Sequence, residues 1–411
     1  MRRLIVPPPG RVAAIGFVTE YLAHLACDEV RGSRSFAGGQ AAADRALAAF
    51  DVAGYASRRN EVRPESRRGA SRLSPYVRHG LLPLREVWDR VAGGPQRDVE
   101  KFRDELLWQE YARHWYARLG VATRHNVRNG LPDSEVGLDA NSLDGWPRSM
   151  ACIDRSLDEL VQDGWLVNQS RMWLASHWTV RTGLRWRDGE DHFFRHLLDG
   201  SRAANRLGWQ WVTAAGSSKP YGFARGQVER RAPGTCDACP LARTCPIEHW
   251  PPDPTLVPVD PPSVDPPSSR STGPAEVVAT GAPEIVWLTA ESLGLADPAS
   301  SSHPELPAIF VFDEPLLARL RLSAKRLVFL TETLAELACH RPLELWLGDP
   351  VEVLSGRELA VTFAPVPGFR RLVEELRPAV LHPWPWLRRP TDGPVASFSA
   401  WRRAADRAER P

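Results

Sequence analysis

Apolar residues recur at intervals of three and four along residues 40–250, a spacing that places them on one face of a helix. The two longest examples are residues 99–118 and 153–181. After residue 283 the pattern changes to short apolar runs, Glu-Ile-Val-Trp-Leu and Pro-Ala-Ile-Phe-Val-Phe-Asp, followed by a helical segment over 323–337 and by Leu-Glu-Leu-Trp-Leu-Gly-Asp-Pro. Because short apolar runs that alternate with a helix are typical of parallel strands joined by crossovers, this part predicts an α/β layer fold.

The segment between these two patterns, residues 251–282, is rich in Pro, Ser, Asp and Thr and holds few large apolar residues. It cannot bury enough surface to fold alone, so we interpret it as a linker that constrains domain placement weakly. The sequence then predicts an N-terminal extension at 1–37, an all-α domain at 38–250, and an α/β domain with a C-terminal tail at 283–411. The predicted fold class is multidomain, an all-α domain followed by a small Rossmann-like α/β domain.

The chain has 411 residues, which is enough for two domains that each bury a core. Its formal net charge of +2 is close to balance, so a nucleic-acid partner would have to contact a local basic surface. Arg67-Arg68 and Arg230-Arg231 could contact phosphates, although solvated surface is the simpler interpretation of each. The chain lacks an apolar run of about eighteen residues and an apolar leader, so we expect a cytoplasmic monomer with no membrane partner.

Six cysteines in a chain expected to be cytoplasmic favour metal, redox or packing roles over disulfides. Three of them lie close together, in the pattern Cys236-x-x-Cys239-x5-Cys245. With His249 as the fourth ligand, these cysteines would form a zinc site of the Cys3His type. Two further cysteines lack partners at metal-ligand spacing, and we interpret both as buried small apolar residues: Cys27 and Cys339.

Five short sequences follow one another between residues 150 and 211: Met-Ala-Cys-Ile-Asp-Arg-Ser-Leu, Gly-Trp-Leu-Val-Asn-Gln-Ser-Arg-Met, Trp-Arg-Asp-Gly-Glu, Asp-Gly-Ser-Arg-Ala-Ala-Asn and Gly-Trp-Gln-Trp. Their order and spacing resemble the flavin-binding helical domain of the DNA photolyase and cryptochrome family. The resemblance implies FAD as the cofactor and a light-driven flavoprotein. In typical members the α/β antenna domain comes first, so the order of domains here resembles a circular permutation.

The resemblance also implies which residues hold the flavin. The segment Gly69-Ala-Ser-Arg-Leu-Ser-Pro-Tyr76 resembles the motif that binds the FAD diphosphate at a helix start, although an ordinary helix N-cap is the alternative. Arg171 and Asp199 match the charged pair beside the isoalloxazine ring, and Asn205 matches the asparagine that faces flavin N5 in repair enzymes. Ser201 stands where many relatives have a second aspartate. The implied flavin-binding residues are Tyr55, Ser71, Leu73, Ser74, Arg171, Asp199, Ser201 and Asn205.

Two further groups of residues match the electron chain and the lesion pocket of the family. Trp209 and Trp186 match the two inner tryptophans that carry electrons to the flavin, and the third member is not located. Repair requires the lesion to leave the duplex and stack on aromatic side chains near the flavin. Val167 and Gln169 replace a histidine and a DNA-contacting arginine of the family. The implied lesion pocket, which favours cyclobutane dimers, is Glu105, Trp108, Asn168, Met172 and Trp211.

The iron–sulfur bacterial cryptochromes and photolyases supply a second interpretation of the cysteines. Cys152 precedes Asn168 by the sixteen residues found in that class, and Ser218-Lys-Pro-Tyr221 matches its sequence before the Cys-x-x-Cys. The resemblance therefore implies a [4Fe–4S] cluster held by four thiolates, with zinc as the alternative. The implied ligands are Cys152, Cys236, Cys239 and Cys245.

The leading hypothesis is a deoxyribodipyrimidine photolyase-like lyase, which breaks carbon–carbon bonds of cyclobutane pyrimidine dimers in DNA by electron transfer from photoexcited reduced FAD. The alternative is a cryptochrome-like photoreceptor without repair activity, and a third hypothesis is a flavoprotein whose cluster only supports the fold. Thr289-Ala-Glu-Ser-Leu293 replaces the Arg-rich strand end of the family's antenna domain, so the antenna chromophore stays open.

Overall fold

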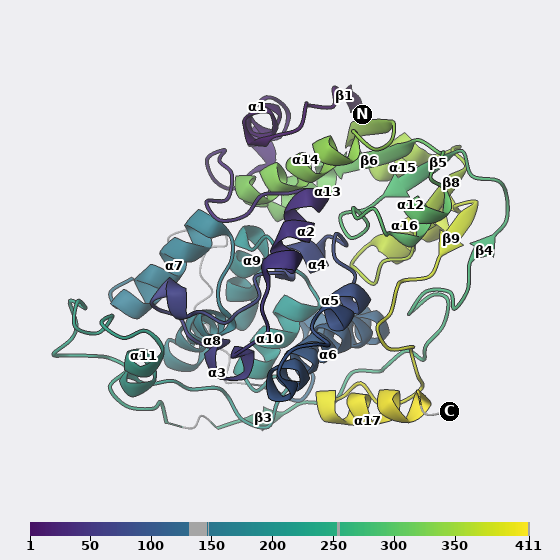
Figure 1. The fold of residues 1–411 in the computed structure, drawn as a ribbon. Helices are drawn as coiled ribbons and strands as arrows, with labels where there is room; N and C mark the ends of the chain where they lie inside the picture. The colour runs from purple at the N-terminus through teal and green to yellow at the C-terminus, as the bar shows by residue number, and fades with distance from the viewer. Residues whose placement is uncertain (131–145, 147, 253–254, 410–411) are drawn as a thin grey trace.

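The chain forms a helical body and an α/β layer, which lie side by side in Figure 1. The structure is a computed structural model, and it describes residues 1–130, 146, 148–252 and 255–409. The predicted class is confirmed, because a helical domain accompanies a smaller α/β domain built on a largely parallel sheet. Among the described helices, none has both the length and the apolar composition that a membrane crossing needs.

A seven-stranded sheet forms the centre of the α/β layer, with the strand order β1-β7-β6-β5-β8-β9-β4 among the described residues. Its inner strands run parallel, whereas β1 and β4 pair antiparallel at the two edges. The apolar runs of the sequence correctly predict β5, β6 and β7. The strands of the sheet are β1 (Arg2–Leu4), β4 (Val278–Ala279), β5 (Ile285–Leu288), β6 (Ala308–Asp313), β7 (Leu343–Gly348), β8 (Leu359–Thr362) and β9 (Val380–His382).

Both faces of this sheet are covered by helices. Successive residues of a strand point to opposite faces, so Ile285 joins a core with Phe369 of α16 (Phe369–Leu376), while Val286 joins a core with Phe329 of α14 (Ala324–Leu337). Burial on both sides explains why these strands read as continuous apolar runs. The remaining helices of the layer are α12 (Pro298–Ser302), α13 (Glu314–Leu320) and α15 (Pro350–Leu354).

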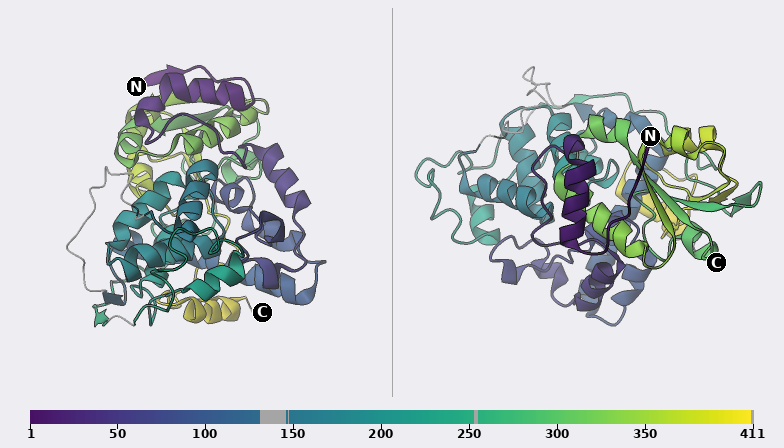
Figure 2. Two further views of the ribbon diagram at one scale, coloured as in Figure 1. Left: turned by 90° about the vertical axis from the view of Figure 1, so that its left-hand side faces the viewer. Right: turned by 90° about the horizontal axis from the view of Figure 1, so that it is seen from above.

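The first residues of the chain contribute to the α/β layer. Strand β1 pairs with β7, and α1 (Arg11–Tyr21) lies along α14, as the left view of Figure 2 shows. Phe17 of α1 reaches β6, where its ring centroid is 5.9 Å from that of Phe312. The segment 1–37, which the sequence analysis treats as an extension, therefore supplies an edge strand and a covering helix.

The helical body corrects one sequence prediction. The apolar period suggests one helical stretch over 153–181, but α7 (Ala151–Asp163) ends at Gly164, whose φ of +68° favours glycine and ends the helix. A new helix, α8 (Asn168–Ser176), follows and closes in a π-helical turn over His177–Arg181. The other helices of the body are α2 (Gln40–Ala49), α3 (Tyr55–Arg58), α4 (Ser74–Arg78), α5 (Leu84–Arg90), α6 (Gln96–Leu119), α9 (Trp186–His196), α10 (Ala204–Val212) and α11 (Arg225–Arg231).

The Pro-rich segment 251–282 contacts the body instead of hanging free between the domains. Its strand β3 (Val257–Pro258) pairs with β2 (Asn129–Gly130), and Arg118 Nε of α6 donates to the Asp265 carbonyl at 2.8 Å. Arg370 Nη2 of α16 donates to the Ser271 carbonyl at 3.1 Å. The segment is therefore held by hydrogen bonds from arginine side chains to its backbone carbonyls. The spacing of apolar residues gives no sign of such contacts. The C-terminal helix α17 (Phe398–Ala408) crosses the body and packs on α6.

Candidate functional site

Arg171 and Asp199 form a two-pronged ion pair in the helical body. Arg171 projects from the first turn of α8, and Asp199 lies in the turn between α9 and α10. The Nη1–Oδ1 distance is 3.1 Å and the Nη2–Oδ2 distance is 2.8 Å, while Arg171 Nε donates to the Leu166 carbonyl. Two parallel charged hydrogen bonds fix the orientation of both groups. The Asp199 side chain is only 6% exposed, so the pair holds a carboxylate away from water.

Asn205, in the first turn of α10, is oriented by a buried carboxylate. Its Nδ2 donates to the Glu190 carbonyl at 3.1 Å and to Glu190 Oε1 at 3.3 Å. Glu190 is 2% exposed and is neutralised by Arg202 Nη1 at 2.7 Å. Ser201 contributes locally, because its hydroxyl accepts from the Ala203 amide and its carbonyl accepts from the Asn205 amide. Glu190 is the last residue of the Trp-Arg-Asp-Gly-Glu motif, but the sequence analysis assigns it no role.

The predicted diphosphate-binding segment leads into α4. Ser74, the first residue of α4, accepts a hydrogen bond from Trp165 Nε1 at 3.0 Å, and the Ser71 hydroxyl accepts from the Leu73 amide. Arg72 adopts a φ of +60°, and its guanidinium lies over the Trp165 ring. Leu73 is buried in the core beneath this segment. Both hydroxyls thus lie in one turn, with an arginine between them.

Tyr55, the first residue of α3, is buried and packs edge-on against Phe102, with 4.9 Å between ring centroids. Burial is the main cause that raises the pKa of its hydroxyl well above the usual range. The phenol therefore stays protonated at neutral pH, and Tyr55 offers a donor without a negative charge.

The predicted lesion-pocket residues lie on α6, α8 and α10. Glu105 Oε1 is 2.8 Å from Lys101 Nζ and 3.3 Å from Arg59 Nε. On α8, Asn168 Nδ2 approaches the Met172 sulfur at 3.5 Å. Trp108 stacks on Phe398 of α17, with 3.9 Å between centroids and 12° between planes. The fifth residue, on α10, is 40% exposed and lies 5.8 Å from the Tyr221 ring: Trp211.

The basic clusters proposed for phosphate contact are mostly committed to internal ion pairs. Both Nη atoms of Arg68 bind the Glu159 carboxylate, at 2.6 and 2.9 Å, and the Arg68 side chain is 5% exposed. Arg67 and Arg231 both pair with Glu61. Gln169 is likewise buried, and its Nε2 donates to the Tyr221 hydroxyl. Arg68, Arg231 and Gln169 are therefore engaged in contacts within the body, whereas the Arg67 side chain is 58% exposed.

Tryptophans gather around Gly189 of α9. An added Cβ there would lie 2.2 Å from Trp209 Cη2 and 3.0 Å from Trp178 Cδ1, so the two indoles meet at this glycine. Trp178 in turn lies beside Trp146, with 4.5 Å between ring centroids. Trp186 is also buried, and its Nε1 donates to Asn126 Oδ1 at 2.9 Å. The sequence missed Trp178 and Trp146 because tryptophan is frequent in this chain and no spacing singles these two out.

Four cysteines line one cavity between α7 and the segment that follows α11. Cys152 lies at the start of α7, and Cys236, Cys239 and Cys245 come from the loop. Burial first, and then the neighbouring thiols, raise the pKa of Cys152 to about 12. Among the described residues, no three of these sulfur atoms lie within 4.8 Å of one another. The imidazole of His249 is exposed and does not line the cavity.

The two remaining cysteines differ from their predicted burial. Cys339 is exposed, and Cys27 is half-buried. Cys339 sits at the open end of α14, where no neighbouring element covers it, so the prediction of a buried residue was wrong there.

The family model described as "FAD binding domain of DNA photolyase" matches residues 102–227. Relatives named "Deoxyribodipyrimidine photo-lyase" include one from Alkalihalophilus pseudofirmus, 30% identical over 159 residues (37% of this chain and 33% of the relative). Another, from Thermus thermophilus, is 32% identical over 178 residues (41% of this chain and 40% of the relative). The chain thus spans about a third to two fifths of the length of these relatives.

Two solved structures were also matched. A bacterial class III photolyase from Agrobacterium tumefaciens is 27% identical, with a TM-score of 0.41 over 47% of this chain and 42% of that one. A cryptochrome from Synechocystis sp. PCC6803 is 19% identical, with a TM-score of 0.43 over 50% of this chain and 46% of that one. The family model covers the segment that carries Arg171, Asp199 and Asn205. This chain therefore carries a segment, residues 102–227, that is similar to the FAD-binding domain of DNA photolyases.

Proposed function

We propose that this protein is a light-dependent DNA repair flavoenzyme that splits cyclobutane pyrimidine dimers. The observation that supports it most is the part-buried Arg171–Asp199 ion pair, together with an asparagine that Glu190 orients, all within the segment matched by the FAD-binding family model. Relatives of this domain are named deoxyribodipyrimidine photo-lyases. When bound, FAD supplies the photoexcited electron that opens the dimer and then accepts it back.

The protein residues would hold charge and hydrogen bonds in fixed places around the flavin. The Arg171 guanidinium would offset negative charge on a reduced ring, and Asp199 would keep that guanidinium in position. Because Asn205 commits Nδ2 to Glu190, its Oδ1 is the atom that can accept a hydrogen bond from an N–H of the reduced ring. The hydroxyls of Ser71 and Ser74 would contact the diphosphate near the start of α4.

We propose a [4Fe–4S] cluster for the four-cysteine cavity. Thiolates around one tetrahedral zinc ion lie about 3.8 Å apart, because Zn–S bonds are about 2.3 Å long. Here no three of the four sulfur atoms lie within 4.8 Å of one another, and Cys152 lines the cavity whereas His249 does not. A cluster of several metal atoms fits this spacing better than one ion does.

The order of the domains supports a circular permutation. The FAD-binding match ends at residue 227, and the first inner strand of the sheet, β5, begins at Ile285. The segment 251–282 joins the two and is anchored by Arg118 and Arg370. We therefore propose a helical domain at 38–250, a connecting segment, and an α/β domain at 283–411 to which the first 37 residues add β1 and α1.

A blue-light repair assay tests the proposed function. Protein purified without oxygen would be illuminated with a reductant and an oligonucleotide that carries a thymine dimer. We expect the absorbance of intact thymine to recover, and only in light. A flavin that photoreduces while the dimers persist would favour the second candidate, a cryptochrome-like photoreceptor. The Trp108–Phe398 stack favours that candidate, because it covers one face of a predicted pocket wall.

Replacing Phe398 with alanine is expected to raise the affinity for dimer-containing DNA about two- to tenfold, because the aromatic stack it removes is worth about 0.5–1.5 kcal/mol. The variant exposes the Trp108 face on which a flipped base can stack. Binding would be measured by fluorescence anisotropy in the dark. Ser399→Ala, an exposed change on the same helix, is the control. Unchanged or weaker binding by Phe398→Ala would show that α17 does not cover the lesion site.

Replacing Trp178 with phenylalanine is expected to slow flavin photoreduction severalfold. Phenylalanine keeps a ring beside Gly189 and Trp146 but is much harder to oxidise, so a hop from Trp146 toward Trp209 loses its intermediate. Flavin bleaching under blue light would be followed by absorbance. Trp173→Phe is the matched control, since Trp173 is equally buried but stacks on Phe223. Equal rates in both variants would exclude Trp178 from the electron path.

A further inference from the structure

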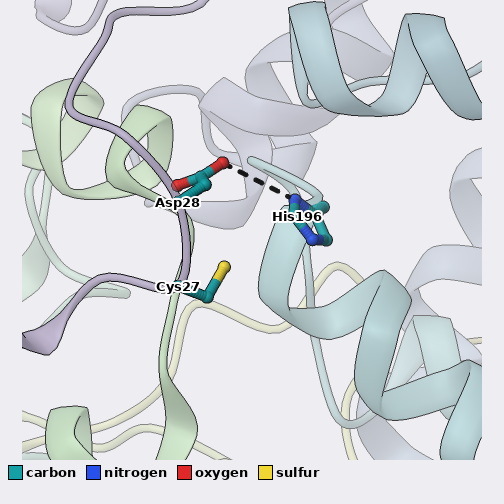
Figure 3. A group of neighbouring side chains, drawn as sticks. All are labelled: Cys27, Asp28 and His196. Carbon is teal, nitrogen blue, oxygen red and sulfur yellow. Dashed lines mark ion pairs between the residues drawn. The ribbon is translucent and has the colours of Figure 1, made fainter. Parts of the chain in front are cut away.

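Three side chains with metal-binding atoms converge where the α/β layer meets the helical body, away from the cysteine cavity (Figure 3). Cys27 and Asp28 follow α1 and a short 3₁₀ turn, and His196 ends α9. The cysteine sulfur, a carboxylate oxygen and an imidazole nitrogen all lie within 4.8 Å of one another. His196 Nδ1 is 3.9 Å from Asp28 Oδ2, which is too long for a hydrogen bond.

The imidazole of His196 lacks hydrogen-bond partners among the described residues. The residue is 3% exposed, and both ring nitrogens are buried without a hydrogen bond. A buried polar group left in this state costs about 1–3 kcal/mol and calls for a specific explanation such as a bound ion. Burial lowers the pKa of His196 to about 3, so the ring is neutral and one nitrogen carries a lone pair. Figure 3 shows the ring on the side of Asp28 and Cys27.

Asp28 is held in place by two neighbours from α14. Its Oδ1 accepts from the Ala324 amide at 2.6 Å, and its Oδ2 accepts from Lys325 Nζ at 3.1 Å. The Lys325 ammonium is fully buried and balances the carboxylate, while burial raises the pKa of Cys27 to about 11 and keeps it a thiol. The four residues together are therefore close to neutral without a metal.

We propose that Cys27, Asp28 and His196 bind one zinc ion that joins the N-terminal segment and α14 to α9. Thiolate, carboxylate and neutral imidazole are the three ligand types of zinc, and bonds of about 2.0–2.3 Å place them about 3.4–3.8 Å apart. The observed 3.9 Å between nitrogen and oxygen needs only a small closure. Water would take the fourth position. This site is independent of the flavin and of the function proposed above.

Charge and protons balance when the ion enters. Zinc displaces the Cys27 proton, and the resulting thiolate and the Asp28 carboxylate neutralise the dication. Lys325 then loses much of its electrostatic support from Asp28. Binding therefore releases one proton, from Cys27, and the site including the Lys325 ammonium carries one net positive charge.

Zinc K-edge absorption on the full-length protein, loaded with Zn²⁺ alone, tests this proposal. We expect a first shell with one sulfur and the rest nitrogen or oxygen. A shell made only of sulfur would place zinc in the four-cysteine cavity, and a shell without sulfur would exclude Cys27; either result overturns the proposal. This measurement needs no variant, so it does not depend on how a substitution folds.

Zinc content after dialysis gives a second, independent readout. Cys27→Ser and His196→Gln are each expected to bind one equivalent fewer than the wild type. Cys339→Ser is the matched control and should bind as much as the wild type, because Cys339 is exposed and lies outside the three-ligand group. Circular dichroism would verify that each variant is folded. Equal zinc content in the folded wild type, Cys27→Ser and His196→Gln would also overturn the proposal.

Discussion

Replacing Arg171 with alanine is expected to abolish FAD retention and to lower the free energy of unfolding by about 3 kcal/mol. The variant leaves Asp199, 6% exposed, without its cation, and a buried unpaired carboxylate is costly. The guanidinium is 23% exposed, so we expect the lower end of the range for broken buried pairs. Flavin content after gel filtration and urea unfolding at fixed protein concentration would measure the two effects.

Arg185→Ala is the control for this variant. Arg185 also pairs with an aspartate, Asp188, at 3.1 Å, but its side chain is 45% exposed. An exposed pair contributes about 0–1 kcal/mol, so this control should keep its flavin and nearly all of its stability. Retention of stoichiometric FAD by Arg171→Ala would show that the pair is a structural ion pair unrelated to the cofactor.

Replacing Cys152 with serine is expected to reduce bound iron from about four atoms per chain to nearly none, because a [4Fe–4S] cluster needs all four thiolates. The same change should weaken the attachment of α7 to the loop after α11, since the cavity between them loses its shared ligand set. Iron and sulfide content, with the absorption spectrum of protein purified without oxygen, would measure the loss.

His249→Ala separates the cluster from the zinc alternative. Under the cluster proposal this variant keeps its metal, because His249 is exposed and lies outside the cavity. Under the zinc interpretation the pattern reverses: His249→Ala loses metal, and Cys152→Ser keeps it. The two variants together therefore decide between the ligand sets, whichever metal the purified protein contains.

Local sequence patterns predicted the parts of this molecule that depend on neighbours in the chain. The period of apolar residues located α6 and α14, and continuous apolar runs located β5, β6 and β7. The same spacing wrongly predicted one continuous helix in place of α7 and α8. The break occurs at Gly164, whose left-handed backbone ends α7 but hardly changes the spacing of the apolar residues. The family resemblance singled out Arg171 and Asp199, which the fold brings together as an ion pair.

Contacts between segments far apart in the chain could not be predicted from local sequence patterns. Strand β1 is too short for a pattern of its own and exists because β7 offers an open edge. Glu190 looks like any charged residue of an amphipathic helix until Asn205 and Arg202 are placed beside it. The sequence suggested that the clustered arginines lie on the solvated surface, whereas in the structure Arg68 pairs with Glu159 and Arg231 pairs with Glu61.

The apolar spacing of the sequence predicted the fold class, and the family resemblance of its motifs implied an FAD-binding domain and the residues that would contact a flavin and a metal. The folded chain was needed to reveal that Phe398 of α17 stacks on Trp108, that Trp178 lies between Trp146 and Trp209, and that His196 faces Cys27 and Asp28. The physical reason is that these contacts join segments far apart in the chain. Their geometry is set by how the helical body and the α/β layer bury their apolar faces, not by any local period.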